Sequence, residues 1–294
     1  MSNFFSATRL TSRVNQLLHS IHGSRSTELD TYIKQIDAEN AAYSNREMLD
    51  AIRQYNHAIV DSLHSIKPLY GLKLLDVGAS PHGYALEKCL LLGAKKYVGI
   101  GLDIHRDTEI RSRRGSGTLT CMNAENLDLE DNSFDAIVTM STFEHISNLP
   151  LALSEFHRVL KPGGHALITF EPIWTCSYGH HLHHLGNVAA LVPAWSHLLW
   201  SQGQMHAYLR ERWPADASLT VDEACRWIYE GDALNRLGIR RTMDILQGAA
   251  LQIEWIMPLL DDARDEKQLQ SAMAATNLTR EELMTKGLSV LMRK

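Results

Sequence analysis

The feature that most constrains this chain is the stretch LLDVGASPHGYALEKCLLLGAKKYVGIGLD, residues 74–103. An apolar run ends at Asp76 and enters a turn containing Gly78 and Gly83, and an amphipathic helical pattern follows. A second apolar run then ends at another acid, Asp103. This order predicts a βαβ unit that binds a nucleotide-type ligand at the carboxyl ends of its strands. Glycine at position 78 lets the backbone approach that ligand, and an acid after the second strand suits a ribose diol.

The glycine turn departs from the dinucleotide-binding pattern G-x-G-x-x-G, because Ser80 stands at its middle glycine and Asp76 precedes its first. Farther on, residues 123–170 read NAENLDLEDNSFDAIVTMSTFEHISNLPLALSEFHRVLKPGGHALITF. With FDAIV, FEHI and RVLKPGG in register with the Asp76 turn, the chain resembles the class I S-adenosylmethionine (SAM)-dependent methyltransferase family. The resemblance is to the small-molecule, type 11-like branch, and it is good over residues 72–170 and looser toward the C-terminus.

The resemblance implies SAM as the cofactor and S-adenosyl-L-homocysteine as the product. Asp76 would hold the methionyl ammonium, and N–H groups at the start of the helix after Gly83 would face the methionyl carboxylate. Asp103 would accept both ribose hydroxyls, and Asn123 would accept a hydrogen bond from the adenine amino group. The expected cofactor-binding residues are Asp76, Gly78, Ala79, Ser80, Gly83, Asp103, Ile104, Asn123, Ala124, Glu125 and Ser141.

Strand and helix patterns alternate along the chain, which predicts a doubly wound parallel sheet. The expected strands are residues 73–77, 97–102, 118–122, 134–139, 165–170, 251–257 and 288–293, and the expected helices include 8–21, 27–38, 45–66 and 236–247. The predicted fold class is α/β, with a Rossmann-like, seven-stranded, mostly parallel sheet flanked by helices. The expected organisation is an N-terminal helical lid (1–68), a SAM-binding core (69–171), a helical and aromatic cap inserted after strand five (172–235) and a C-terminal completion of the core sheet (236–294). Tyr43 of the lid is a further candidate contact of the cofactor.

Composition excludes several classes of partner. A net charge of −5 argues against a broad nucleic-acid-binding face, and no apolar run reaches membrane-spanning length. The four cysteines form no C-x-x-C pair, which predicts free thiols and a cytoplasmic protein. The first 27 residues contain arginines but no acid, as in a mitochondrial transit peptide, although their apolar spacing equally suits a helix packed on the domain. The expected partner is a small-molecule acceptor, and a homodimer stays open.

Two segments at the carboxyl ends of the fourth and fifth strands carry the groups expected to meet the acceptor. The first is STFEH, residues 141–145, in which His145 is a candidate general base or a structural hydrogen-bonding residue. The second is EPIWTCSYGHHLHHLGN, residues 171–187, whose aromatic and histidine content is typical of a small-molecule pocket. The expected catalytic residues are His145, His180 and His181, and the expected acceptor-binding residues are Trp174, Tyr178, His183 and His184.

The histidine cluster leaves three interpretations open: cap structure, acid–base or substrate contact, and metal binding. In a helix, His180 and His184 would share one face, as metal-binding pairs do. No acid follows nearby in the sequence, although Glu144 or Glu171 could approach in space, and no metal site is assigned. We expect His180 or His181 to face the acceptor, because a flexible Tyr178–Gly179 hinge would lie just before them.

These features predict SAM-dependent methyl transfer to an oxygen or nitrogen of a small molecule, such as a specialised metabolite, by in-line displacement. Carbon methylation and a protein or RNA acceptor are alternatives. The turn Gly-Ala-Ser-Pro resembles that of RNA 2′-O-ribose methyltransferases, but the Lys-Asp-Lys-Glu set of those enzymes is missing. A non-catalytic SAM-binding scaffold is an alternative of another class, and the intact set of Asp76, Gly78 and Asp103 argues against it.

Overall fold

The structure, a computed structural model, describes residues 27–42, 46–182 and 186–294. Its strands are β1 (Lys73–Val77), β2 (Lys96–Gly101), β3 (Thr108–Arg111), β4 (Ser116–Cys121), β5 (Phe134–Met140), β6 (Leu160–Phe170), β7 (Gln252–Leu260) and β8 (Thr285–Arg293). Within the described residues they form one eight-stranded sheet in the order β3-β4-β2-β1-β5-β6-β8-β7. Strands β4, β2, β1, β5 and β6 run parallel, whereas β3 and β8 are antiparallel to their neighbours. The predicted α/β class with a Rossmann-like, mostly parallel sheet is confirmed.

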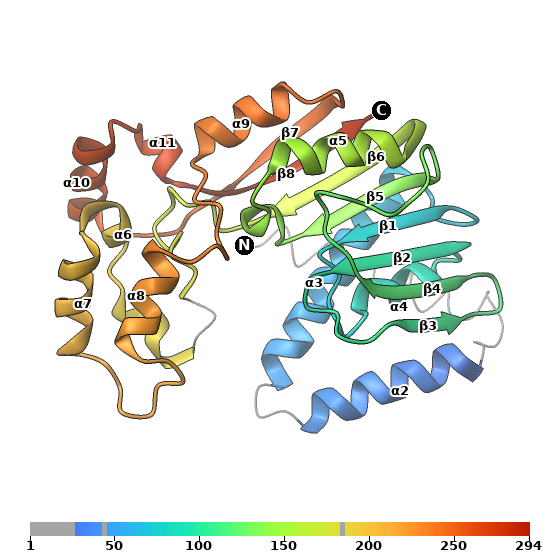
Figure 1. Cartoon of the computed structure of the whole chain (residues 1–294), viewed down its shortest axis with the longest axis horizontal. Coiled ribbons are helices and arrows are strands. Elements are labelled where there is room, and N and C mark those ends of the chain that lie inside the picture. The colour runs from blue at the N-terminus through green and yellow to red at the C-terminus, as the bar shows by residue number, and fades with distance from the viewer. Residues whose placement is uncertain (1–26, 43–45, 183–185) are drawn as a thin grey trace.

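Helices cover both faces of the sheet (Figure 1). They are α2 (Thr27–Ala42), α3 (Arg46–Ile66) and α4 (Tyr84–Leu91) on one face, and α5 (Leu149–Val159) and α9 (Ile239–Gln247) on the other. Successive side chains of a strand point to opposite faces, so β1 contributes to both cores. Leu74 belongs to the core with α2, α3 and α4, whereas Leu75 and Val77 belong to the core with α5 and α9. The apolar run of β1 is therefore continuous because it is buried from both sides.

The sheet has one strand more than the seven predicted. Strand β3 pairs antiparallel with β4 at the edge of the sheet, and its burial alternates along only four residues. Because Ile110 is the only apolar side chain of β3, the sequence contains no apolar run that would predict this strand. Strand β6 also begins five residues earlier than predicted, since the segment from Leu160 to Gly164 is extended rather than a turn.

The cap lies beside the sheet and consists of short helices (Figure 1). They are η3 (Gly186–Leu191), α6 (Ser196–Leu199), α7 (Gln202–Arg210), α8 (Val221–Tyr229), α10 (Glu266–Thr276) and α11 (Arg280–Leu283). Trp195 is fully buried and packs with Leu269 of α10 and Leu283 of α11. The C-terminal part of the chain thus supplies helices to the cap as well as β7 and β8 to the sheet.

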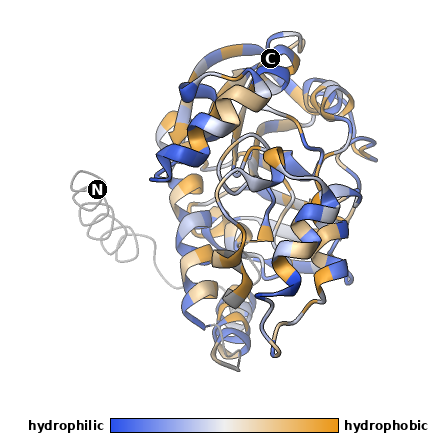
Figure 2. Ribbon diagram, turned by 90° about the vertical axis from the view of Figure 1, so that its left-hand side faces the viewer, coloured by the Kyte–Doolittle hydropathy of each residue, from blue (hydrophilic) through white to orange (hydrophobic). Residues whose placement is uncertain are grey.

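Two of the predicted N-terminal helices are present, as α2 and α3. The predicted helix 8–21, the transit-peptide alternative and Tyr43 fall outside the described residues. None of the helices in the described ranges is both long and apolar enough to span a membrane. The helices around the sheet instead carry hydrophilic and hydrophobic residues side by side, as surface helices packed on a core do (Figure 2).

Candidate functional site

The turn between β1 and α4 is shaped by two glycines with left-handed backbone, Gly78 (φ 79°) and Gly83 (φ 65°). A side chain on Gly78 would overlap Thr142, which follows β5, and one on Gly83 would overlap the Tyr32 hydroxyl from α2. Glycine is therefore required at both positions by the backbone angle and by the neighbouring protein atoms. Thr142, rather than a ligand, occupies the space that a Cβ at position 78 would enter.

The turn is braced by hydrogen bonds to the neighbouring strand. The N–H groups of Gly78 and Ala79 both donate to the Ile100 carbonyl at the end of β2, over 2.8 and 2.9 Å. The Ser80 hydroxyl accepts from the His82 N–H at 3.3 Å. The N–H groups suited to an anionic ligand are thus those in the first turn of α4, as in other helix N-termini.

Asp76, at the end of β1, is fully buried, and Tyr97 of β2 donates a short hydrogen bond to its Oδ2. Its Oδ1 has no hydrogen-bond partner among the described residues. Burial raises the pKa of Asp76 to about 7, and the Tyr97 hydrogen bond opposes the rise. A buried carboxyl oxygen without a partner is costly. An ammonium group, reached directly or through water, would satisfy it, so Asp76 fits the expected cofactor.

We expect Asp76→Asn to flatten the pH dependence of stability between pH 4 and 7. A carboxyl whose pKa is raised by folding stabilises the fold while it is protonated. Its contribution is complete below its ordinary pKa of 3.8 and is lost as the pH rises through about 7. Urea denaturation across this range should show the wild type losing up to about 1.4 kcal/mol per pH unit more than the variant. Tyr97→Phe should shift the loss to higher pH, and parallel curves for wild type and Asp76→Asn would contradict the assignment.

The end of β2 presents Asp103 beside the glycine turn. Asp103 is exposed, whereas Ile104 is buried. A methyl group on Gly101 would lie 3.0 Å from Asp103 Oδ1 and 3.3 Å from the Ala79 carbonyl oxygen, so both groups border the same small space. The structure thus brings Asp103, Ile104 and Ala79 together at the carboxyl edge of β1 and β2.

The loop after β4 uses its polar groups partly within the protein. Asn123 is exposed, and its Oδ1 accepts from the Glu125 N–H at 2.9 Å. The Glu125 carboxylate in turn accepts from the Asn148 N–H at 2.8 Å, at the start of α5. Ala124 is buried beneath them. Glu125 therefore fixes the loop, and Asn123 keeps one lone pair and its amino group for a ligand.

Ser141, after β5, has left-handed backbone (φ 47°), and its N–H donates to the Thr169 carbonyl at 2.8 Å. The Tyr55 side chain from α3 faces Ser141, and burial raises the pKa of Tyr55 to about 12. Tyr55 was not anticipated, because only the packing of α3 against β5 brings a residue 86 positions away to this loop.

A cavity of about 650 Å³ lies beside Ser141, at the carboxyl ends of β5 and β6. Its wall includes Tyr178 and His180, and an ion pair of 2.8 Å between Glu171 and Lys286 of β8. The other lining residues are Pro172, Ser177, Val192, Ala194, Ala263, Arg264 and Asp265. The volume is typical of small-molecule sites, which measure roughly 300–1,000 Å³.

His180 is buried in this wall and acts as a hydrogen-bond donor in its neutral form. Its Nδ1 accepts from the Leu182 N–H at 3.1 Å, which leaves the proton on Nε2. Its ring lies edge-on to His197, 5.5 Å between centroids, and His197 is held by the Trp174 carbonyl at 2.7 Å. Burial lowers the pKa of His197 to about 4. The Leu182 hydrogen bond thus engages one ring nitrogen of His180 within the protein, while the ring itself lines the cavity.

His145 and His181 have the opposite tautomer. His145 lies in the short helix η1 (Phe143–His145), and its Nδ1 donates to the Ala233 carbonyl at 2.6 Å. His181 Nδ1 donates to the Gly179 carbonyl at 2.7 Å. In each neutral ring the lone pair is therefore on Nε2. The two rings lie 5.3 Å apart between centroids, nearly perpendicular at 70°.

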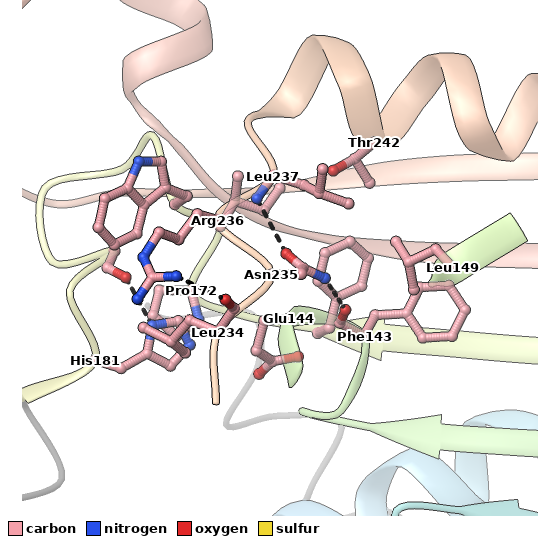
Figure 3. A pocket seen from close by; sticks show the side chains of 14 residues that line it. Phe143, Glu144, Leu149, Pro172, His181, Leu234, Asn235, Arg236, Leu237 and Thr242 are labelled. Atoms are coloured by element: carbon pink, nitrogen blue, oxygen red, sulfur yellow. Dashed lines mark hydrogen bonds between the residues drawn. The ribbon is translucent and has the colours of Figure 1, made fainter. Parts of the chain in front are cut away.

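Glu144 lies against this histidine pair. Its carboxyl group is buried, which raises its pKa well above the ordinary value, and its Oε2 has no hydrogen-bond partner among the described residues. Glu144 and His181 both line a cavity of about 10 Å³, whose other lining residues include Phe143, Pro172, Asn235 and Arg236 (Figure 3). Carboxyl and imidazole groups from two separate loops thus meet at one point.

The segment from Trp174 to His181 is a series of turns rather than a helix. The i,i+4 pair of His180 and His184 extends beyond the described residues. Gly179 is not a flexible hinge, because it is buried and packs against the Trp174 carbonyl. Trp174 lines the small cavity beside Glu144 and faces the Arg236 guanidinium at 5.7 Å. His183 and His184 fall outside the described residues.

With this geometry established, comparison with known proteins defines the class. Residues 75–168 match the family described as "Methyltransferase domain". This segment belongs to the class I SAM-dependent methyltransferases, of the type 11-like branch, and SAM is the cofactor of that family.

Curated relatives match only part of the chain. A mitochondrial ubiquinone biosynthesis O-methyltransferase from Mus musculus is 31% identical over 146 residues, covering 46% of this chain and 38% of that protein. A sterol 24-C-methyltransferase from Yarrowia lipolytica is 32% identical over 128 residues, covering 42% and 32%. A solved SAM-dependent methyltransferase from Mesorhizobium loti covers 80% of this chain and 96% of its own, with 16% identity and a TM-score of 0.47. The chain spans less than half the length of the two curated relatives.

Proposed function

We propose that this chain is a SAM-dependent methyltransferase that methylates an oxygen or nitrogen of a small-molecule acceptor. The observation that carries the proposal is the cavity of about 650 Å³ beside Ser141. The next residue, Thr142, packs against Gly78 of the cofactor turn, so the cavity adjoins the expected cofactor edge. Methyl transfer requires acceptor, methyl and sulfur in line, and two adjoining sites are what that geometry needs.

The residues at the edge fit the cofactor by charge and position. When bound, SAM supplies the activated methyl group. Asp76 would meet the methionyl ammonium, the first turn of α4 its carboxylate, and Asp103 the ribose hydroxyls. Asn123 and Ala124 would contact the adenine, while Glu125 holds their loop in place.

The tautomers of the histidines indicate which protein groups would contact the acceptor. The His180 ring would contact the acceptor in the cavity, and Tyr178 would provide a wall for it. As the new C–O or C–N bond forms, the C–S bond breaks with its electron pair on sulfur, and the acceptor must lose a proton. The lone pairs of His145 and His181 are suited to that loss, as proton acceptors or as ligands of a cation that acidifies the acceptor.

Transfer to oxygen or nitrogen is favoured over carbon by these lone-pair groups, although the relatives include both an O- and a C-methyltransferase. A small acceptor is favoured over nucleic acid by the net charge of −5. All four cysteines are free thiols, which suits a reducing compartment such as the cytoplasm.

The test is a product screen with isotopically labelled SAM against a panel of small hydroxyl, amine and carbon-acid compounds, with calorimetry of S-adenosyl-L-homocysteine binding first. Binding together with label transfer to an oxygen or nitrogen supports the proposal. If S-adenosyl-L-homocysteine does not bind, the proposal that the chain is a SAM-dependent methyltransferase fails. Label found only on carbon overturns the O- or N-transfer part alone.

We expect Asp103→Ala to weaken S-adenosyl-L-homocysteine binding by about 10- to 100-fold, because charge-assisted hydrogen bonds contribute about 1.5–3 kcal/mol. Titration calorimetry measures this directly. Asp244→Ala is the matched control, since it removes an exposed acid of α9 and the same unit of charge. Equal affinity for both variants would remove Asp103 from the cofactor site.

A further inference from the structure

Glu144, His145 and His181 meet at one point although they come from different loops. One ligand-type atom of each lies within 4.8 Å of those of the other two. Glu144 and His145 follow β5, and His181 follows β6. Because β5 and β6 are parallel neighbours, their carboxyl ends place both loops at the same edge of the sheet.

The orientation of both rings is fixed from behind by backbone carbonyls. His145 Nδ1 donates to Ala233 and His181 Nδ1 donates to Gly179, over 2.6 and 2.7 Å. This Nδ1–H···O=C arrangement is the one that metal-binding histidines use to set their tautomer and present Nε2. Rings inclined by 70° can direct two such nitrogens at one ion from different sides.

Glu144 supplies the charge that such a site needs. Its side chain is buried, with 6% of the residue exposed, and its Oε2 has no hydrogen-bond partner in the described part of the chain. Glu144 and His181 both line a cavity of about 10 Å³, close to the space of a single water-sized occupant. A buried carboxylate is stable only when it is paired, and a cation at this point would pair it.

We propose that Glu144, His145 and His181 bind one divalent transition-metal ion of the Zn²⁺ type. Two imidazoles and a carboxylate are a ligand set of catalytic zinc and non-haem metal sites, with at least one position left open. Zn–N and Zn–O bonds of about 2.0–2.2 Å require the three side chains to close in by about 1 Å. Such an ion would supply a Lewis acid at the edge of the sheet where β5 and β6 end. The inference goes beyond the proposed function, since metal binding needs neither SAM nor an acceptor.

The experiment uses untagged full-length protein, stripped with a chelator and titrated calorimetrically with Zn²⁺. We expect one ion per chain. Glu144→Gln, which keeps the side-chain volume, and His181→Asn, which tolerates the left-handed backbone at this position (φ 60°), should each weaken binding at least about 100-fold. His206→Ala is the matched control, because it removes another histidine with a carboxylate partner, Asp222 at 2.7 Å in the cap, and should bind as wild type does.

Co²⁺ gives a readout that needs no variant. Bound at two imidazoles and a carboxylate, it should show the intense visible bands of four- or five-coordinate cobalt, and these should disappear when Zn²⁺ is added. Sub-stoichiometric Zn²⁺ binding, or wild-type affinity in both folded variants, overturns the proposal, as does a pale octahedral Co²⁺ spectrum. None of these outcomes affects the methyltransferase proposal, which rests on S-adenosyl-L-homocysteine binding and label transfer.

Discussion

His181→Asn should lower methyl-transfer turnover by about two to four orders of magnitude, while affinity for S-adenosyl-L-homocysteine stays within a few-fold of wild type. General acid–base groups contribute effects of about this size, and so does the loss of an acidifying cation. The expected cofactor residues lie at the ends of β1, β2, β4 and β5, so a change after β6 should remove chemistry rather than cofactor binding. Asparagine is the appropriate replacement because it accepts the positive φ of 60° found here.

Two further variants serve as comparisons for His181→Asn. His180→Ala removes a ring that contacts the acceptor and should cost about 10- to 100-fold in kcat/KM. His206→Ala, on helix α7 of the cap, should leave turnover unchanged. Steady-state kinetics with the acceptor found in the product screen measures all three. A His181→Asn enzyme within a few-fold of wild type would make the His145–His181 pair structural.

Gly78→Ala should destabilise the protein by about 2–5 kcal/mol. A left-handed backbone costs an alanine about 1–2 kcal/mol, and overpacking adds about 1–3 kcal/mol. The new Cβ would overlap the Thr142 side chain, so the turn after β1 and the loop after β5 would have to move apart. Chemical denaturation measures the stability, and calorimetry measures the accompanying loss of cofactor affinity.

A Gly71→Ala variant separates the contribution of the left-handed backbone from that of overpacking. Gly71 has nearly the same backbone angle (φ 76°), but a Cβ there meets no heavy atom within 4 Å, so Gly71→Ala should cost only the backbone contribution. Thr142→Ala removes the two nearest atoms of Thr142 and should recover about 1–2 kcal/mol in the Gly78→Ala background. Equal losses at positions 71 and 78, with no recovery, would mean that Thr142 does not restrict the turn.

Much of the fold was predictable because its signals are local. Strand β1 was predicted at its observed bounds, because its apolar residues Leu74, Leu75 and Val77 lie between Gly71 and the turn at Gly78. Strand β3 was missed because an edge strand with one partly buried apolar side chain resembles a polar loop. The turns from Trp174 to His181 could not be predicted from the sequence, because backbone packing around Gly179, rather than side-chain periodicity, sets them.

The candidate site likewise contains residues that could be predicted from the sequence and residues that only the structure brings there. Asp76 and Asp103 could be predicted because each lies at or near the carboxyl end of a strand, and parallel strands carry these ends to one edge. Tyr55 and Lys286 could not, because they reach the Ser141 region from α3 and β8. The roles of the three histidines also needed the structure, because the backbone group that each Nδ1 meets decides which nitrogen keeps the proton.

The sequence alone determined the βαβ unit, the parallel sheet and the acids at its carboxyl edge, because strand burial and glycine turns are encoded by neighbouring residues. Only the tertiary structure decided which side chains from distant segments contact these glycines and acids. Thr142 rather than a ligand restricts Gly78, Tyr97 holds the buried Asp76, and Glu144 meets His181 across two loops. These are contacts between chain segments that no local pattern links, and they form only when the sheet and its cap are packed.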